Sequence, residues 1–203
     1  MRPLVLDEIL DLESYDRARS AFRAAIIALK RERRLAVGDR VSLVFENRET
    51  LRFQVQEMLR AERICKPDRM QQELDVYNEL MPGPRNLSAT LFIEITDAAD
   101  IRSELDRLIG IDEHVALVLG GAAEEEALPA SFDPRQMEED RISAVQYLRF
   151  PFEAEQAERF ADTRVRARVR IDHPNYRAEA EIPDPMRRQL LEDLEGRAVA
   201  LLY

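Results

Sequence analysis

The sequence predicts an α+β fold, in which residues 1–203 form a single domain with a mainly antiparallel sheet packed by several helices. Three observations predict it. Segments with the 3.6-residue period of a helix and the two-residue period of a strand are unevenly interleaved along the chain. Several strand-like segments follow one another through short turns, which join antiparallel strands and not parallel ones. A chain of this length also buries roughly 70% of its unfolded surface, so it forms a core without disulfides.

The first predicted helix runs from about Ser14 to Arg33, because apolar side chains recur there every three or four residues. Ser14 is its expected N-cap. The C-terminal end is basic, because four of the five residues 30–34 are cations: Lys30, Arg31, Arg33 and Arg34. Such cations match the negative end of the helix dipole, so a solvated terminus is favoured over an anion-binding patch.

A strand is predicted over residues 35–45, with a turn or bulge at Gly38. After a turn at residues 47–49, Thr50 is expected to cap a helix that continues to Ile64. The next elements follow from the same two periods. They are a helix from Asp68 to Met81, a strand from Leu87 to Ile95, a helix capped by Asp97 and ended by Gly110, and a strand from Val115 to Leu119.

Residues 120–140 show no sustained period and much acid, so a surface loop or hinge is expected there, with a possible internal domain boundary. The pattern then returns. The predicted elements are a strand over 142–152, a helix over 153–162, paired strands over 165–171 and 176–182, a helix from Pro185 to Leu194 and a possible terminal strand over 199–202. In the paired strands, Glu179 and Glu181 are expected to lie opposite a row of arginines.

Charge and composition exclude several classes of protein. The chain has 30 basic and 40 acidic residues, and the net charge of −10 argues against non-specific binding to nucleic acid or anionic membranes. No run of about 18 uncharged apolar residues predicts a membrane span, and the first residues lack the apolar region of a signal peptide. The one cysteine, Cys65, rules out an internal disulfide and fits a reducing compartment. A cytoplasmic location is therefore expected.

The motifs of several enzyme classes are missing from the sequence. It has no phosphate-binding loop of the Walker type, no dinucleotide glycine fingerprint, no His-Glu-x-x-His and no serine elbow. Its two histidines, His114 and His173, are too few for a di-iron site with two Glu-x-x-His motifs or for a zinc site of cysteines and histidines. No metal or cofactor is expected, and whether the protein is an enzyme stays open.

Polar side chains gather where the strand over residues 35–45 ends and the next helix begins: Glu46, Arg48, Gln54, Glu57 and Arg60. Gln54 and Glu57 lie beside the apolar stripe of that helix, so they are expected to be partly buried. One interpretation is a carboxylate and amide pair that holds a ligand, a metal or a partner's backbone. The favoured interpretation is an ion-pair network that fixes the helix to the end of the strand.

A second cluster occupies the turn over residues 172–177. His173 follows an aspartate and is a candidate base or ligand, with Tyr176 as a donor nearby. Adjacent residues on an extended chain point to opposite faces, and His-Pro-Asn is typical of a tight turn, so a structural role is favoured. A composite site requires both clusters to meet across one concave surface.

Four stretches carry a resemblance to a known family: Glu46–Ile64, Ile27–Arg34, Glu73–Asn78 and Asp172–Arg177. They are similar, in the same order and over nearly the whole chain, to the bacterial domain-of-unknown-function family 3501. The resemblance implies one family-wide domain and no activity that can be assigned to residues. It also implies a context, because members are often encoded beside a rubrerythrin and an iron–sulfur oxidoreductase.

These observations lead to two hypotheses. The first is a cytoplasmic, non-catalytic accessory or interaction protein with a redox enzyme as its protein partner. The alternative is a protein, either a binding protein or an enzyme, that binds a small ligand or a metal. Glu46, Arg48, Gln54, Glu57 and Arg60 surround the site, and His173 or Tyr176 joins from the second cluster.

Overall fold

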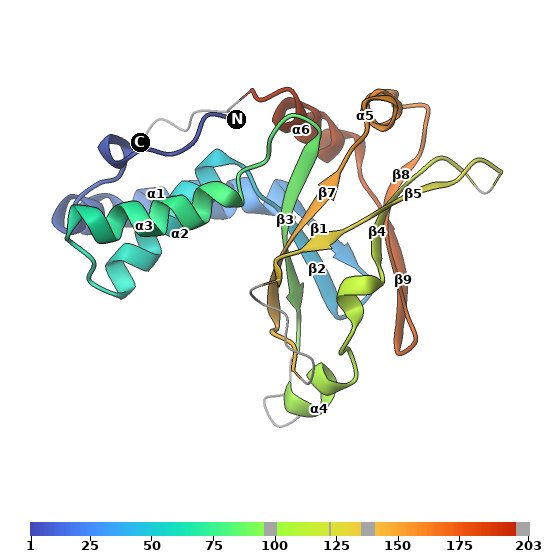
Figure 1. Ribbon diagram of the computed structural model, residues 1–203, viewed down its shortest axis with the longest axis horizontal. Helices are drawn as coiled ribbons and strands as arrows, with labels where there is room; N and C mark the ends of the chain where they lie inside the picture. Colours follow the sequence, from blue (N-terminus) through green and yellow to red (C-terminus); the bar gives the residue numbers. More distant parts are fainter. Residues whose placement is uncertain (96–100, 122, 135–140, 198–203) are drawn as a thin grey trace.

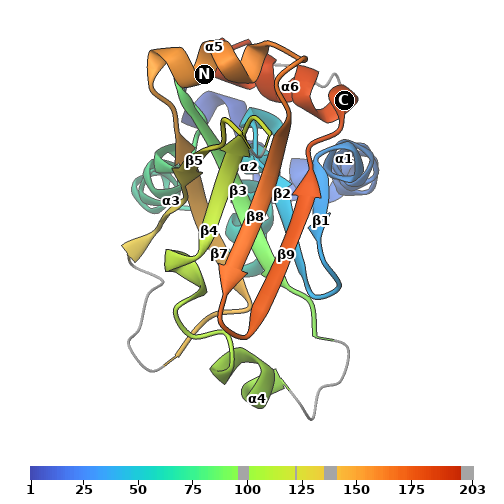
Figure 2. The same ribbon diagram turned by 90° about the vertical axis from the view of Figure 1, so that its right-hand side faces the viewer.

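Two antiparallel sheets packed face to face form the centre of the protein (Figures 1 and 2). The computed structural model describes residues 1–95, 101–121, 123–134 and 141–197. The five-stranded sheet has the order β1 (Arg34–Val37), β2 (Val41–Phe45), β3 (Asn86–Ile93), β7 (Val145–Pro151) and β6 (Ser131–Phe132). The four-stranded sheet has the order β5 (Glu126–Pro129), β4 (Val115–Leu119), β8 (Ala167–His173) and β9 (Tyr176–Glu181).

Helices cover the outer face of the five-stranded sheet and both ends of the two sheets. Three helices lie beside the five-stranded sheet, on the side away from the four-stranded sheet (Figure 1): α1 (Leu12–Glu32), α2 (Arg48–Ala61) and α3 (Pro67–Glu79). Two more, α5 (Ala154–Ala161) and α6 (Asp184–Leu194), lie at one end, and the short α4 (Ile101–Asp106) lies at the other (Figure 2). Single 3₁₀ turns occur at Leu6–Glu8 and Ile111–Glu113. The predicted α+β class is confirmed.

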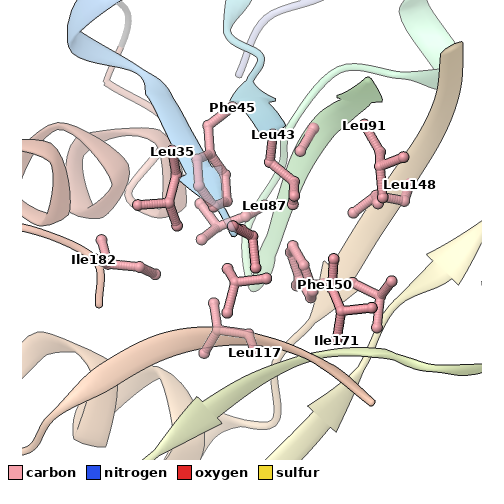
Figure 3. Packing of buried hydrophobic residues seen from close by; sticks show 14 of the residues in the cluster. Leu35, Leu43, Phe45, Leu87, Leu91, Leu117, Leu148, Phe150, Ile171 and Ile182 are labelled. Atoms are coloured by element: carbon pink, nitrogen blue, oxygen red, sulfur yellow. The ribbon is translucent and has the colours of Figure 1, made fainter. Parts of the chain in front are cut away.

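The main core lies between the two sheets, where Leu43 and Phe45 of β2 face Leu117 and Ile171 of the other sheet (Figure 3). A second apolar cluster lies under the helices and includes Leu51 of α2 and Leu74 of α3. The centre of the five-stranded sheet is therefore buried on both faces, and every residue of β2 is buried. None of the helices in the described part of the chain has the length and hydropathy to cross a membrane.

The caps of two helices differ from those predicted. Helix α1 begins at Leu12, and its N-cap is Asp11, whose carboxylate accepts the backbone N–H of Ser14 at 2.9 Å. Helix α2 is capped by Asn47, whose side chain accepts the N–H groups of Glu49 and Thr50, while the Thr50 hydroxyl accepts the N–H of Asn47 at 2.8 Å. Ser14 and Thr50 thus take part in the capping bonds from inside each helix, because the preceding Asp or Asn caps equally well.

The predicted strand over residues 35–45 is two strands, β1 and β2, which form a hairpin. Gly38 makes the turn with φ of +78°, a conformation that side chains disfavour. A Cβ atom at Gly38 would lie 2.9 Å from the Cβ of Ala178 and would collide with the hydroxyl of Tyr176. The turn therefore allows β1 to approach β9 closely.

Replacing Gly38 by alanine is expected to lower the free energy of unfolding by about 2 to 4 kcal/mol, from the left-handed backbone and the collision together. Urea unfolding measures the change. The control is Gly121→Ala, because a Cβ there meets no atom within 4 Å. Equal stability of the two variants would contradict this account of the turn.

Residues 120–140, predicted as a loop or hinge, contain the two short strands β5 and β6. Strand β5 pairs with β4 in one sheet and β6 pairs with β7 in the other, and Ala130 lies between them. The stretch thus joins the two sheets that enclose the common core. Strands of four and two residues are too short to show a period of two, which explains why the sequence pattern missed them. The predicted cap at Asp97 and the strand over 199–202 lie outside the described residues.

At the basic end of α1, Arg31 and Arg34 are exposed, as a solvated terminus predicts, but Arg33 is buried. Arg33 is 2% exposed, and its guanidinium pairs with the carboxylate of Asp193 on α6. It also donates to the carbonyl of Phe45 at 2.8 Å and to that of Glu46 at 3.3 Å. A second buried arginine, Arg187, attaches α6 to the C-terminal end of α5 and to the segment that follows it, by donating to four backbone carbonyls. Two buried cations therefore hold α6.

The β8–β9 hairpin has the predicted charge pairing. Glu179 lies opposite Arg170 in the register and accepts hydrogen bonds from both Arg168 and Arg170. Glu181 accepts a hydrogen bond from Arg166 at 3.1 Å. The row of arginines is thus largely neutralised by carboxylates of the neighbouring strand, and it is not a free basic face.

Candidate functional site

The structure divides the seven predicted site residues between two sides of the protein. Five of them lie at the end of β2 or on α2, in the helical layer: Glu46, Arg48, Gln54, Glu57 and Arg60. The other two, His173 and Tyr176, lie at the turn of the β8–β9 hairpin. The five-stranded sheet stands between the helical layer and the four-stranded sheet (Figure 1), so the two groups do not share a concave surface.

Glu57 belongs to a polar network between α1 and α2. Arg19 donates to both of its carboxylate oxygens at 2.8 Å, and the Tyr15 hydroxyl donates to it at 2.6 Å. Next to this network, Arg60 pairs with Asp16 at 2.5 Å. The hydrogen bonds from Arg19 lower the pKa of Glu57, whereas burial and the bond to Glu57 raise the pKa of Tyr15. The network joins two helices.

Replacing Glu57 by glutamine is expected to lower the free energy of unfolding at pH 7 by about 1 to 2 kcal/mol, since a half-exposed charge-assisted pair is lost. The pKa of Glu57 is lower in the folded protein than in the unfolded one. Its contribution is therefore complete above about pH 4.5 and decreases as the pH falls through the folded-state pKa. Urea unfolding at pH 7 and pH 4 should show a larger difference at pH 7; a difference that grows on acidification would contradict this assignment.

Arg48 fixes the N-terminal segment to the start of α2. Its guanidinium donates to the carbonyl of Arg2 at 3.1 Å and to that of Pro3 at 3.4 Å, and it pairs with the carboxylate of Glu8. Burial raises the pKa of Glu8, but the hydrogen bond from the backbone N–H of Val5 and the pairing with Arg48 lower it. The pKa of Glu8 is therefore lowered overall. Arg48 is thus occupied by contacts within the chain.

His173 and Tyr176 also make internal contacts. The Nε2 atom of His173 lies 3.0 Å from the carbonyl oxygen of Ile109, and its Nδ1 atom accepts the N–H of Asn175 at 3.2 Å. These bonds assign the neutral ring with its proton on Nε2. The Tyr176 hydroxyl donates to the carbonyl of Val37 at 2.6 Å and accepts the N–H of Arg40. Both side chains therefore hold turns and neighbouring strands together.

Glu46 and Gln54 lie in a buried polar cluster between the five-stranded sheet and the helices. Glu46 is 1% exposed, and one of its oxygens accepts the hydroxyl of Thr90 at 2.6 Å. The other oxygen has no hydrogen-bond partner in the described part of the chain. Gln54 accepts the hydroxyl of Tyr147 at 3.4 Å, and Tyr147 is hydrogen-bonded to Tyr77. Burial, and then the carboxylate of Glu46, raise the pKa of Tyr147.

A cavity of about 340 Å³ opens beside this cluster, between the C-terminal end of α3 and strands β6 and β7. We call it the α3–β7 cavity; its lining residues are Glu79, Leu80, Ser131, Phe132, Asp133, Pro134, Tyr147, Leu148 and Arg149. None of them is among the predicted site residues. The alternation in β7 predicts that Tyr147 and Arg149 lie on one face of the strand, opposite the buried Leu148 and Phe150. No pattern in the sequence predicts that these two residues of β7 lie next to α3. In the described ranges, no group of three or more His, Cys, Asp or Glu side chains is placed to hold a metal.

Comparison with known proteins supports the fold and gives no activity. The model of a family described as "Protein of unknown function (DUF3501)" matches residues 3–194. A crystal structure described as a novel protein of unknown function from Burkholderia pseudomallei is similar, with 33% sequence identity and a TM-score of 0.87. The match covers 95% of this chain and 100% of that one. No curated protein matches.

Proposed function

Because the chain belongs to the domain-of-unknown-function family 3501, to which no activity is attached, we propose a function from its surface. It is a non-catalytic accessory protein of the cytoplasm that binds a redox enzyme through the outer face of α1. The observation that carries the proposal is a shallow hollow lined by apolar side chains and by arginines. We call this the α1 surface; it is formed by Asp16, Arg19, Ser20, Arg23, Ala24, Ile27 and Arg60.

The α1 surface has the composition of a protein-binding site. Ile27 is 45% exposed, and Ala24 beside it is also exposed. They lie on one side of α1 with Ser20 and Arg23, at the spacing of three and four residues that places side chains on a common face. An exposed aliphatic residue with arginines beside it is typical of the centre of a protein interface.

The charge of the α1 surface favours an acidic partner. Asp16 pairs with Arg60, and Glu57 neutralises Arg19. Arg23 has no such pair among the described residues, so this surface keeps a positive charge on a protein whose net charge is −10. A partner with carboxylates around an apolar patch is therefore complementary to it.

Two further points support the proposal. The side chains that the sequence suggested as catalytic or ligand-binding groups, such as Glu57 and His173, make hydrogen bonds within the chain. The resemblance described above implies genes for a rubrerythrin and an iron–sulfur oxidoreductase nearby, so those two proteins are the partners to test first.

The test measures binding of the purified protein to a rubrerythrin and to an iron–sulfur oxidoreductase from the same organism. Ile27→Asp and Arg23→Glu are expected to weaken the complex at least about tenfold, as substitutions at an interface centre do. Val76→Asp is the control, because Val76 is 43% exposed on α3. The proposal is wrong if neither enzyme binds, or if Val76→Asp weakens binding as much as Ile27→Asp does.

The alternative function is binding of a small ligand or a metal around Glu57. Such a ligand has to displace Arg19 and Tyr15, which bond both oxygens of this carboxylate. Metal analysis of the purified protein, together with ligand binding to Glu57→Ala, separates the two functions. A bound metal that is lost in Glu57→Ala would favour the alternative.

A further inference from the structure

We propose that the α3–β7 cavity binds a small carboxylate-bearing molecule, with the guanidinium of Arg149 as its anion contact. The cavity lies on strands β6 and β7 and the end of α3, whereas the α1 surface lies on α1 and α2. The proposal therefore stands independently of the partner proposed above, and failure of one does not decide the other.

Arg149 differs from the other shielded arginines of the protein. Arg33 and Arg168 have carboxylate partners, and Arg187 has four carbonyl partners. Arg149 is half-buried, and within the described ranges its side chain has neither an ion pair nor a hydrogen bond. A guanidinium withdrawn from bulk water without a partner is costly, and a carboxylate satisfies it with two parallel hydrogen bonds.

Hydroxyl groups stand beside Arg149 on the same side of the cavity wall. Tyr147 is two residues away in β7, so both side chains lie on the same face of the strand. Its hydroxyl, whose pKa is raised by burial and by Glu46, already donates to the side chain of Gln54 at 3.4 Å. Ser131 contributes a second hydroxyl from β6, the strand that pairs Ser131 with Arg149. The cavity thus offers one cation and one neutral donor, the hydroxyl of Ser131.

The remaining walls limit the size and charge of the ligand. Leu80, Phe132 and Pro134 supply apolar surface for a hydrocarbon body. Glu79 and Asp133 also line the cavity, and their charges disfavour a dianion such as phosphate. A volume of about 340 Å³ is at the lower end of ligand pockets. The class that fits is a small apolar carboxylate with a net charge of −1, or of zero where it also bears an ammonium group.

Three probes that share a phenylethyl group test which ligand charge the cavity binds. They are 3-phenylpropionate as the anion, L-phenylalanine as the zwitterion and phenethylamine as the cation. Each is titrated into ¹⁵N-labelled full-length protein, and the amide shifts of residues 131–133 and 147–149 are followed. We expect saturable shifts with at least one of the two carboxylates and none with the amine. Binding of the amine alone, or no saturable shift with any probe at millimolar concentration, overturns the proposal.

Variants of Arg149 show which side chain is responsible. Arg149→Gln is expected to weaken carboxylate binding about 10- to 100-fold, the loss of a charge-assisted hydrogen-bond pair, and Arg149→Lys is expected to restore part of it. Arg188→Gln, at an exposed position of α6, is the matched control and keeps full affinity. Unchanged binding in Arg149→Gln overturns the assignment. If that variant does not fold, Arg149→Lys decides, because it keeps the charge but loses the bidentate geometry, and equal affinity in it contradicts the proposed contact.

Discussion

Replacing Asp193 by alanine is expected to lower the free energy of unfolding by about 3 to 5 kcal/mol, the cost of breaking a buried ion pair from one side. Arg33 and Asp193 are 2% and 4% exposed at their side chains. An arginine cannot lose its proton in a protein, so the variant leaves a buried charge with only carbonyl and amide acceptors. For a domain of this size the melting temperature is expected to fall by about 10 °C.

Differential scanning calorimetry and urea unfolding measure this loss. Glu195→Ala is the control, because Glu195 is exposed near the same end of α6 and, among the residues that the structure describes, forms an ion pair only with the exposed Arg197. That substitution is expected to change stability by no more than about 0.5 kcal/mol. Similar melting temperatures for Asp193→Ala and the wild type would show that the pair does not hold α6.

The pH dependence of this pair has the opposite sign to that of Glu57. Burial raises the pKa of Asp193 to about 6, although Arg33 acts in the other direction. The folded protein therefore binds a proton between about pH 6 and pH 4 that the unfolded chain does not yet bind. The contribution of this carboxyl to the free energy of unfolding rises as the pH falls through that window. The gap between wild type and Asp193→Ala is thus expected to be no smaller at pH 5 than at pH 7.5.

Arg187→Leu is the second substitution with a large expected effect, a loss of about 3 to 5 kcal/mol in the free energy of unfolding. The Arg187 guanidinium donates to the carbonyls of Arg159, Phe160, Asp162 and Val165. Leucine keeps an apolar side chain against the ring of Phe160 but removes the guanidinium donor from all four carbonyls, of which that of Asp162 keeps the N–H of Val165 at 2.9 Å. A buried acceptor without a partner costs about 1 to 3 kcal/mol, and partial access of water reduces the sum.

Limited trypsin digestion gives a local measurement of the same loss. Arg164 lies in the segment that Arg187 holds and is exposed, so freeing that segment is expected to speed cleavage after Arg164. Arg188→Leu, one residue along α6 and exposed, is the control and is expected to leave both stability and digestion unchanged. Faster digestion in both variants would mean that the effect does not come from the four carbonyls.

Much of the fold was predictable from local pattern. Strands β3, β8 and β9 lie where the alternating side chains predicted strands, although β3 is buried on both faces, and α1, α2, α3 and α6 follow the helical period. What escaped prediction depends on contacts between distant segments. Strands β5 and β6 are defined by their pairing with β4 and β7, and Arg33 is buried because Asp193, 160 residues away in the chain, reaches it.

The candidate site likewise depends both on local pattern and on contacts between distant segments, and only the local pattern was predictable. Neighbourhood in the sequence suggested one cluster. Gln54 and Glu57 are three residues apart and lie only about 60° apart around α2, but different segments pack against them. Gln54 meets Tyr147 on the sheet side, and Glu57 meets Arg19 on α1. The α3–β7 cavity combines residues from segments around 80, 132 and 148, and no local pattern indicates that these segments meet.

The edges of the two sheets have a consequence for behaviour at high concentration. Strand β9 lies beside β1, and the Tyr176 hydroxyl bonds the carbonyl of Val37 across them. At the other side, the described edge strands β5 and β6 have four and two residues, and one short stretch of chain links them. Strand addition by a second molecule needs a long row of free backbone donors and acceptors. We therefore expect concentrated solutions to resist fibril formation for as long as the native structure persists.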